Sequence, residues 1–335
     1  MRMKARFIKI QDAGQLASFG RAGIVAPIES DQLLRESPDA HWVLADANAC
    51  ILARCSLWWK KTPPYPVDNL GLIGHYAATD ADSGRQLLCH ACVQLASKGC
   101  TMAVGPMDGN TWRNYRFITD RGTEPPFFLE IDHPDDWPNH FTSEGFTALA
   151  NYTSALNSDL VRPDPRIPAF EAGIARMSIR IRHARAEEME NEMCRMFEVS
   201  LRSFQDNFLY TPLEEGEFLA QYRKVLPCVR PELVLLAERA DDLVGFSFAV
   251  PDLIQAKRGA PVDRIVLKTL AVVPECGSMG LGTLLMARSH LSAHELGYKA
   301  CVHAFMHEAN RSRGMSSRTA YTIRRYTLFS KPLVT

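Results

Sequence analysis

Three prolines within six residues interrupt the chain close to its midpoint, at Pro163, Pro165 and Pro168. Proline fixes its backbone φ angle and lacks an N–H donor, so we expect residues 162–168 to join neither a helix nor an inner strand. A chain of 335 residues also exceeds the usual size of one hydrophobic core. The sequence therefore predicts two domains, residues 1–157 and 177–335, joined by a linker over residues 158–176.

A pair of short apolar segments recurs in the same order on both sides of this linker. Residues 43–46 and 51–56 have the pattern of a two-stranded hairpin, and so do residues 235–238 and 243–247. A shift of 192 positions relates the two pairs. This regularity indicates a duplicated unit.

The repeat continues with a strand, a helix and a second strand. Residues 71–78 align with residues 265–272, and the helix that follows ends in each half at a glycine, Gly99 or Gly297, which is typical just past a helix C-terminus. Each half is thus expected to contain a strand, helices, a hairpin, a strand, a helix, a strand, a helix and a terminal hairpin. This order predicts an α/β fold with two similar domains, each a mixed, mostly antiparallel sheet flanked by helices.

The charge balance gives no reason to expect a nucleic acid or an anionic membrane as the main partner. The 38 basic residues equal the 38 acidic residues in number, and no apolar run approaches the roughly 18 residues that span a bilayer. The basic start, residues 1–6, is followed by polar residues before any long apolar core, so we expect no secretion signal and a cytoplasmic protein.

The nine cysteines show no regular framework, and we expect reduced thiols. Cys89 and Cys92 have the spacing of a metal or redox pair within a helical pattern. No second pair completes a set of four ligands, so the sequence predicts two buried apolar side chains and no metal site.

The segment with the most chemical information is a strand that leads through a glycine-containing loop into a helix. Pro274 ends the apolar strand, and residues 277–283 read Gly-Ser-Met-Gly-Leu-Gly-Thr. Leu284, Ala287 and Leu291 then recur at helical spacing. Glycines at a helix N-terminus let backbone N–H groups approach an anion, and the helix dipole favours phosphate there. The segment therefore predicts a pyrophosphate site.

Two other phosphate-binding loops fit this sequence poorly. The loop of nucleotide hydrolases ends in Gly-Lys followed by Ser or Thr, and no such lysine is present. The dinucleotide fingerprint reads GxGxxG at the start of a domain, whereas this loop reads GxxGxG and follows several earlier elements. Neither ligand class is predicted.

The strand, the loop, the helix, the next strand and the asparagine after it resemble the GNAT (GCN5-related N-acetyltransferase) superfamily of acyl-CoA-dependent N-acyltransferases. The resemblance is strongest over residues 233–329, and residues 1–157 resemble a degenerate copy. It implies acetyl-CoA as co-substrate, no metal, and a primary amine of a small molecule or protein as acceptor. In that family the loop amides hold the CoA pyrophosphate, while the strand and the asparagine bind the pantetheine arm. The cofactor-binding residues implied here are Leu270, Ala271, Val272, Gly277, Ser278, Met279, Gly280, Leu281, Gly282, Thr283 and Asn310.

Two positions depart from the family pattern. The family usually has arginine or glutamine three residues before the first essential glycine, and Gly277 stands there, so one charge-assisted phosphate contact is missing. The family's tyrosine seven residues after the asparagine, the general acid for the thiolate, is replaced by Ser317. Either Ser317, a displaced Tyr321 or solvent is then the acid, or protonation of the thiolate matters less. These departures leave open a second class of function, a non-catalytic acyl-CoA-binding sensor or scaffold.

Acyl transfer to an amine also needs a base for the ammonium proton. The candidates His303, His307 and Glu308 lie in or just after the strand that follows the loop and helix. A histidine in mid-strand is more often a hydrogen-bonded core residue, whereas Glu308 follows where the chain leaves the sheet. Glu308 is therefore the predicted base.

Two aromatic-rich segments bear on the acceptor. Residues 203–212 lie where the family lines its acceptor groove, although packing between helices explains them equally well. In residues 105–116, aromatics alternate with arginines, and we expect a loop packed against the other half rather than a nucleic-acid site. The oligomeric state, monomer or homodimer, is left open.

The N-terminal counterpart of the phosphate loop is expected to bind no CoA. It is four residues shorter and carries Asp80 and Asp82, whose charges would repel a pyrophosphate. The sequence thus predicts one CoA site in the chain, with the N-terminal half in a structural or acceptor-shaping role.

Overall fold

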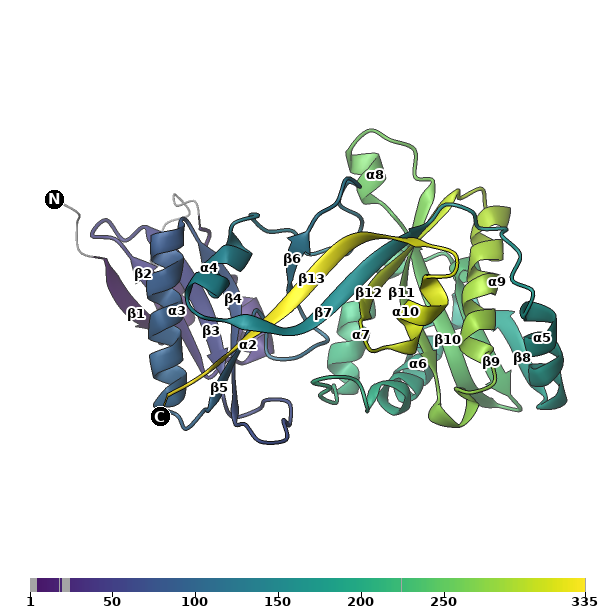
Figure 1. Ribbon diagram of the computed structural model, residues 1–335, viewed down its shortest axis with the longest axis horizontal. Helices are drawn as coiled ribbons and strands as arrows, with labels where there is room; N and C mark the ends of the chain where they lie inside the picture. The colour runs from purple at the N-terminus through teal and green to yellow at the C-terminus, as the bar shows by residue number, and fades with distance from the viewer. Residues whose placement is uncertain (1–4, 18, 20–24, 224, 335) are drawn as a thin grey trace.

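Thirteen strands form one sheet in the part of the chain that the computed structural model describes, residues 5–17, 19, 25–223 and 225–334. The strand order is β1-β2-β3-β4-β5-β13-β7-β12-β11-β10-β9-β8, with β6 paired to β13 (Figure 1). The only parallel pairs within this described sheet are β4 with β5 and β11 with β12. The predicted α/β fold with mixed, mostly antiparallel pairing is confirmed.

The two halves repeat nearly the same series of elements. The N-terminal series is β1 (Arg6–Ile10), α1 (Ala13–Ala17), α2 (Ser30–Glu36), β2 (Ala40–Ala45), β3 (Ile51–Trp58), β4 (Leu70–Ala78), α3 (Ala81–Ala96), β5 (Met102–Gly105), β6 (Phe117–Asp120), α4 (Trp137–Ser143) and β7 (Thr147–Asn157). The C-terminal series is α5 (Ile167–Arg176), β8 (Ile179–His183), α6 (Met189–Phe204), α7 (Glu215–Arg223), β9 (Val234–Arg239), β10 (Asp242–Pro251), α8 (Ile254–Lys257), β11 (Arg264–Val272), α9 (Leu281–Glu295), β12 (Ala300–His307), α10 (Arg311–Ser316) and β13 (Tyr321–Pro332). The predicted hairpins are β2–β3 and β9–β10.

The predicted terminal hairpin within each half is wrong. Strand β13, the last of the chain, lies between β5 and β7 of the N-terminal half, and β7 in turn pairs with β12 of the C-terminal half. Figure 1 shows β7 and β13 running side by side from one half to the other. The internal repeat predicts the order of the strands along the chain. It does not predict whether the last strand of each half pairs within its own half or with the other half. The two halves are therefore joined by exchanged strands, and the boundaries 1–157 and 177–335 stay a prediction about sequence units.

A buried ion pair fixes the exchanged strand β13 to the N-terminal half. The Arg324 side chain, 1% exposed, donates from Nε to Glu130 at 2.7 Å, and its Nη2 donates to the carbonyl oxygens of Glu124 and Pro125. The hydroxyl of Tyr326, on the same strand, also donates to Glu130 at 2.7 Å. Buried charges are tolerated when they are paired and hydrogen-bonded in this way.

The proline-rich linker is partly helical, contrary to expectation. Helix α5 begins at Ile167 with Pro168 in its first turn, where the missing N–H has no intrahelical partner to lose. Pro163 and Pro165 remain outside regular structure, as predicted.

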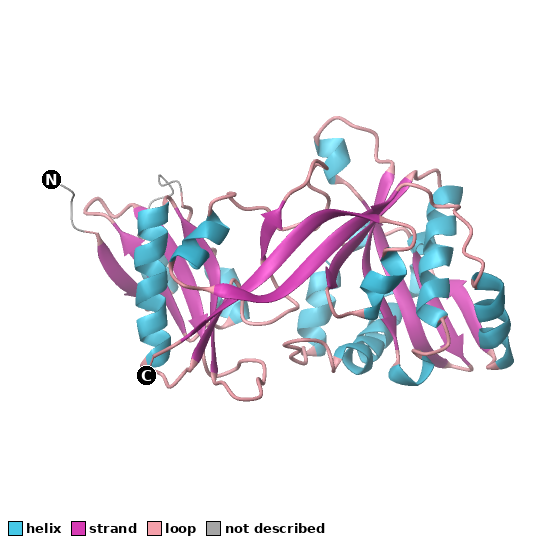
Figure 2. Ribbon diagram, in the orientation of Figure 1, coloured by secondary structure: helices cyan, strands magenta, loops and turns pink. Residues whose placement is uncertain are grey.

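Helices flank the sheet at both ends, and the long exchanged strands cross the middle (Figure 2). Helix α3 packs on β3, β4 and α4, while α6 and α9 both pack on β10 and β11. Two glycines with positive φ, Gly99 at 82° and Gly297 at 89°, follow α3 and α9 as predicted. On α3, Cys92 is buried but Cys89 is exposed. The prediction that both cysteine side chains are buried is therefore right for Cys92 and wrong for Cys89.

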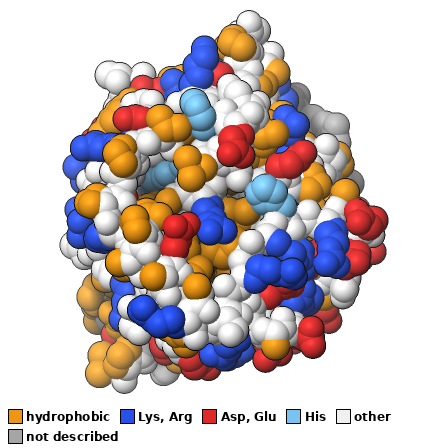
Figure 3. Space-filling model, turned by 90° about the vertical axis from the view of Figure 1, so that its right-hand side faces the viewer, with side chains coloured by type: hydrophobic (Ala, Val, Ile, Leu, Met, Phe, Trp, Pro, Cys, Tyr) orange, Lys and Arg blue, Asp and Glu red, His pale blue; other side chains and the backbone are white. Residues whose placement is uncertain are grey.

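None of the described helices is long and apolar enough to cross a membrane. Over the molecular face drawn in Figure 3, basic, acidic and hydrophobic side chains are interspersed. This distribution agrees with the equal numbers of basic and acidic residues in the sequence.

Candidate functional site

Strands β11 and β12 begin as a parallel pair and then separate. Their ladder runs from Arg264 and Ala300 to Leu267 and His303, and no later pair is formed within the described strands. Beyond this point β12 carries a bulge, where its register with β7 shifts and Phe305 has a positive φ of 59°. Because a bulge bends its strand, β12 turns away from β11, and β11 has no neighbouring strand on that side while β10 stays paired on the other.

A cleft of about 700 Å³ opens where these strands separate, and both halves of the chain line it. The C-terminal half contributes Leu267, Lys268, Thr269 and Leu270 of β11, residues 303–307 of β12, and several residues of α6, α7, α9 and α10. The N-terminal half contributes residues near the end of α2, the segment 111–116, and Tyr152 of β7. The exchange of β7 and β13 therefore places N-terminal side chains beside the strand gap.

The start of α9 has free backbone donors. Gly280 is its N-cap with φ 78°, and no side chain caps the first turn in the described structure. Gly280 also has no room for a side chain, because a Cβ would lie 2.3 Å from the ring of Phe170 on α5. Helix α5, in the predicted linker, thus packs against the glycine loop through the ring of Phe170. The glycine loop forms the strand-to-helix turn that the sequence predicts, with uncapped N–H groups that suit a pyrophosphate.

The loop and the cleft are adjacent through α10. A Cβ on Gly282 would lie 3.6 Å from the sulfur of Met315, and Met315 lines the cleft. Asn310 also lines it as the N-cap of α10, and its side chain makes no capping hydrogen bond. Leu270 lines the cleft, whereas residues 271–272 and 277–283 lie beyond its lining. The predicted cofactor residues are thus grouped around one end of the cleft, and their roles stay a prediction.

Arg311 occupies the place of the side chain that Gly277 lacks. Its Nη1 lies 3.5 Å from the position that a Cβ on Gly277 would take. Arg311 is exposed on the first turn of α10, one residue after Asn310. The loop pattern could not reveal this arginine, because it lies on α10 and not in the loop.

The corresponding gap in the N-terminal half is closed. The parallel ladder of β4 and β5 ends at Leu72 and Val104, and the chain after β5 folds back against β4. The N–H of Met107 donates to the carbonyl of Ile73 at 2.9 Å, and the N–H of His75 donates to the carboxylate of Asp108 at 2.6 Å. These bonds occupy backbone groups whose counterparts in β11 face the cleft.

The N-terminal counterpart of the phosphate loop is closed as well. Asp80 caps α3 by accepting from the N–H of Ser83 at 2.8 Å, and this bond lowers the pKa of the Asp80 carboxyl. Gly84 in the first turn is covered, because a Cβ there would lie 2.4 Å from the Tyr76 hydroxyl and 2.6 Å from the His140 ring. The first turn of α3 thus has a carboxylate cap where α9 has none, and Gly84 leaves no room for a ligand at its own position.

A second polar cluster lies on the N-terminal side of the cleft. Glu36, which lines the cleft, accepts from Nε2 of His75 at 2.6 Å, while Nδ1 of His75 is hydrogen-bonded to Ser56 at 2.8 Å. Glu36, His75 and Asp108 each have an atom that could ligate a metal ion, and these three atoms lie within 4.8 Å of one another. These hydrogen bonds use both ring nitrogens of His75 and hold the Glu36 carboxylate at the cleft wall.

The three predicted catalytic residues lie outside the lining of the cleft. Glu308 and Ser317 are exposed, and Ser317 donates back to the carbonyl of Gly314 at 3.2 Å. Tyr321 is 53% exposed with its hydroxyl 3.4 Å from Glu124, and desolvation raises its pKa. Their assignments stay predictions that the geometry does not favour.

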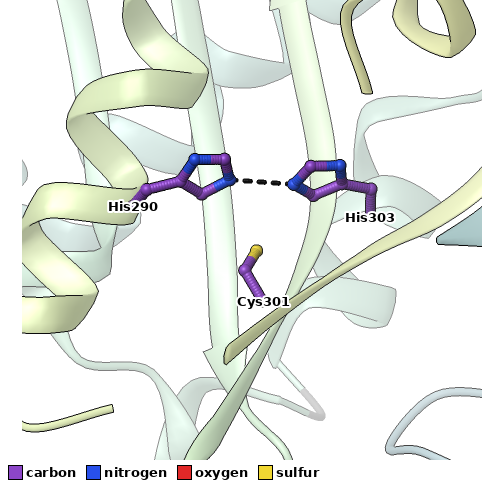
Figure 4. A group of neighbouring side chains, drawn as sticks. All are labelled: His290, Cys301 and His303. Atoms are coloured by element: carbon purple, nitrogen blue, oxygen red, sulfur yellow. Dashed lines mark hydrogen bonds between the residues drawn. The ribbon is translucent and has the colours of Figure 1, made fainter. Parts of the chain in front are cut away.

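His303 is a hydrogen-bonded core histidine, as the sequence suggested. Its Nε2 lies 2.8 Å from Nε2 of His290, with Cys301 beside the pair (Figure 4), and its Nδ1 lies 2.7 Å from the hydroxyl of Ser316. Burial lowers the pKa of His290 to about 4 and that of His303 well below its usual range, so both rings are neutral near pH 7.

These two neutral rings form a chain with defined donors. Asn157 donates to Nδ1 of His290, so His290 donates from Nε2 to His303, which then donates from Nδ1 to Ser316. Ser316, buried and part of the cleft lining, keeps its own proton for another acceptor. The arrangement positions the Ser316 hydroxyl at the cleft wall.

His307 is the titratable group at the end of β12 that does line the cleft. Its ring packs edge-on against Tyr152 and is half-buried, and burial lowers its pKa while the neighbouring Glu308 carboxylate opposes that change. Its Nδ1 accepts from the N–H of Ala309 at 3.0 Å. Ala309 is exposed and can donate to water instead. His307 can then take a proton within the cleft.

The two aromatic-rich segments meet at the cleft. Phe204, Phe208 and Tyr210 line it, and the indole N–H of Trp112 donates to the carbonyl of Thr211 at 2.9 Å. The expectation that residues 105–116 pack against the other half is confirmed. The sequence indicated no individual role for Arg116, the last residue of this segment.

Comparison with known proteins adds the fold family. No family model and no curated protein match the sequence. A tandem GNAT protein from the clavulanic acid biosynthesis pathway matches with a TM-score of 0.51 and 13% identity, over 99% of each chain. The chain has the tandem GNAT fold.

Other solved structures agree with this tandem GNAT fold. A GCN5-related N-acetyltransferase from Sphaerobacter thermophilus has a TM-score of 0.51 and 11% identity, over 99% of this chain and 98% of that one. A GCN5-related glucosamine N-acetyltransferase region of a fungal multi-domain GH3 β-N-acetylglucosaminidase has a TM-score of 0.54 and 14% identity, over 98% of this chain. This chain spans 38% of the length of that fungal protein.

Proposed function

We propose that this tandem GNAT protein is an N-acyltransferase that moves an acyl group, acetyl in the first instance, from CoA to a primary amine. The observation that carries the proposal is the gap between β11 and β12 beyond Leu267 and His303, beside the uncapped first turn of α9. The cleft at this gap is lined by both halves of the chain. The fold neighbours that are N-acetyltransferases support the same reaction class.

The residues present fit an acyl-CoA at this end of the cleft. The first-turn N–H groups of α9 and the guanidinium of Arg311 suit the pyrophosphate. The free side chain of Asn310 and the unpaired backbone edge of β11 suit the amides of the pantetheine arm. Backbone N–H groups of β11 near Leu270 would then stabilise the oxyanion that forms on the thioester carbonyl.

The reaction joins the amine nitrogen to the acyl carbon, breaks the carbon–sulfur bond, and releases CoA thiol. His307 accepts the proton that the ammonium loses, because its lowered pKa leaves the ring neutral near pH 7. The Ser316 hydroxyl, held by His303, donates a hydrogen bond to the departing sulfur, which leaves as the thiol after it takes the second proton that the nitrogen loses. Glu36 attracts the cationic acceptor from the N-terminal wall.

An acceptor screen tests the proposal. Acetyl-CoA is incubated with a panel of amines that includes amino acids, polyamines, a lysine peptide and glucosamine, and free thiol release is followed. Glucosamine belongs in the panel because one fold neighbour contains a glucosamine N-acetyltransferase region. Turnover with any amine that is lost in Gly282→Asp supports the enzyme. Tight CoA binding without turnover across the panel selects the binding module instead.

A further inference from the structure

Arg116 is a buried cation without a hydrogen-bonding partner on two of its nitrogens. The residue is 6% exposed and lines the cleft, and its Nε and Nη1 find no partner among the described residues. No carboxylate of the described chain forms an ion pair with it; Glu130, which the nearby Tyr326 reaches, is already bonded to Arg324. A satisfied core arginine would resemble Arg324, with its guanidinium bonds occupied.

Aromatic rings hold this guanidinium in place. Its central carbon lies 4.1 Å from the ring centre of Tyr115, 4.5 Å from Phe305, 4.8 Å from Tyr152 and 5.5 Å from Tyr326. Ring faces attract a cation and fix its orientation, but they accept none of its N–H hydrogen bonds. The rings therefore position Arg116 while they leave its donors unused.

The position of Arg116 connects it to the acyl-transfer end of the cleft. Phe305, which it contacts, is the bulged residue where β12 turns away from β11. Tyr152, another of its rings, packs against His307. The buried hydroxyl of Tyr210, which also lines the cleft, has no hydrogen-bond partner in the described structure either.

Basic side chains outnumber acidic ones in the lining of the cleft, which also favours an anionic ligand. Four basic side chains line it, Arg35, Arg113, Arg116 and Lys268, against one acidic side chain, Glu36. Arg113 is engaged by Glu217 at 2.7 Å, and Lys268 lies over the ring of Tyr222. An unpaired charge in a low-dielectric site is unfavourable until a counter-ion arrives, so a ligand anion would be bound strongly there.

We propose that the acceptor is an amine that also carries an anionic group, and that Arg116 binds this group. The inference rests on the proposed acyl-transfer function and specifies its substrate class. A carboxylate and a phosphate share the chemistry that the guanidinium recognises, so both sources are compared. Glu36, on the same cleft, provides the opposite charge for the ammonium end.

Matched acceptors and matched variants test this assignment. The acceptor sets are glycine, glycinamide and methylamine; 4-aminobutyrate and butylamine; and O-phosphoethanolamine and ethanolamine. Each is assayed with acetyl-CoA on wild type, Arg116→Met and Arg325→Met. Arg325 is an exposed arginine of β13 outside the cleft lining, so its variant controls for the loss of a charge.

The proposal expects wild type to prefer the anionic member of at least one set. Arg116→Met should raise the KM for that acceptor at least about tenfold, as loss of one partner of a buried charge pair does, and leave the KM for its neutral match within about twofold. Arg325→Met should behave as wild type. Preference for carboxylate or for phosphate identifies which anion the site takes.

Three results separate the possible failures. Turnover of neutral amines with no preference for any anion in wild type overturns the anionic acceptor and leaves the enzyme standing. An anion preference that persists in Arg116→Met overturns the role of Arg116. If no amine turns over, calorimetric titration of the carboxylates and of O-phosphoethanolamine into CoA-saturated wild type and Arg116→Lys decides: binding of either anion that Arg116→Lys weakens supports the site, and equal or absent binding of both rejects it.

Discussion

The carboxylate of Asp108 accepts the backbone N–H of His75 at 2.6 Å and thereby closes the N-terminal strand gap. The neighbouring Gly74 leaves room for this contact, since a Cβ there would lie 2.2 Å from the carbonyl oxygen of Met107. In the C-terminal half the same stretch of strand faces the cleft. One duplicated strand gap is thus filled by the protein itself, and the other is left for a ligand.

The first prediction is that each chain binds one CoA. Calorimetric titration should give a stoichiometry of one, because Asp80 and Asp108 close both N-terminal positions where CoA would bind. Gly282→Asp should abolish binding, since a carboxylate would face the pyrophosphate, while a Cβ at Gly282 meets nothing closer than 3.6 Å.

The control for that prediction is Gly216→Asp on α7, where a Cβ has open space and the loop is not involved. Gly280 is a poorer test, because its positive φ and the ring of Phe170 would disturb folding. Two CoA molecules per chain, or wild-type affinity in folded Gly282→Asp, would contradict the cofactor site.

The second prediction concerns the arginine beside the loop. Arg311→Ala should weaken CoA binding by roughly three- to tenfold, as expected for one exposed charge-assisted contact. Pantetheine, which lacks the pyrophosphate, should bind the variant and wild type equally. Adding Gly277→Arg to Arg311→Ala should restore CoA affinity, because the two side chains would reach the same place. Equal losses for CoA and pantetheine would mean that Arg311 acts through α10 instead.

Local patterns predicted much of the fold, and the global pairing was beyond them. Apolar runs and the glycines after helices identified the strands and helices of both halves. The exchange of β7 and β13 depends on contacts between residues 144 or more positions apart, such as Cys301 with Asn157 and Tyr152 with Tyr326, which no local pattern contains. The spacing of Leu284, Ala287 and Leu291 suggested one apolar face of α9, but Leu291 is exposed and His290 is buried. Hydrogen bonds to Asn157 and His303 allow that burial.

The site residues also differ in whether a local sequence pattern could locate them. The loop, Leu270 and Asn310 follow one another closely in sequence, so a motif could locate them. Arg116 and Glu36 come from the other half, and their place in the cleft follows from the strand exchange. Ser316 is the last residue of α10 and Ser317 its C-cap, and only the path of the helix decides that the first is buried in the cleft wall and the second exposed.

The third prediction distinguishes His307 from Glu308 as the base. His307→Gln should lower kcat/KM and remove the acidic limb of its pH profile. Glu308→Gln should keep that limb and move it to lower pH, because the Glu308 carboxylate raises the pKa of His307. A limb that vanishes in Glu308→Gln and persists in His307→Gln would restore Glu308 as the base.

The fourth prediction is a rise in stability between about pH 4 and pH 6.5. The pKa of His290 is lowered to about 4 in the folded chain, against about 6.5 for an ordinary histidine. Between these values the unfolded chain binds the proton and the folded chain does not, so stability is complete above pH 6.5 and falls as pH falls, by about 1.4 kcal/mol per pH unit and proton.

Chemical denaturation at several pH values measures this slope. His290→Gln should make it shallower, and His294→Gln, at an exposed histidine of the same helix, should leave it unchanged. His41, His290 and His303 all have lowered pKa values, so part of the slope should persist in His290→Gln. An identical slope in both variants would show that His290 is protonated in the folded chain.

The last prediction tests whether the exchanged strand makes the two halves one folding unit. Arg324→Met leaves the carboxylate of Glu130 buried without its main partner, and breaking a buried pair in this way costs about 3–5 kcal/mol. The adjacent Arg325→Met removes an exposed arginine and should change the free energy of unfolding by less than about 1 kcal/mol. Because β13 pairs with β5 and β7, and β7 pairs with β12 of the C-terminal half, the destabilisation should reach both halves. The five tryptophans all lie before residue 138, so their fluorescence reports on the N-terminal half, and hydrogen exchange on α9 reports on the C-terminal half. Both probes should show one shared transition at lower denaturant concentration. A loss confined to one half would show that the halves fold separately despite the exchange.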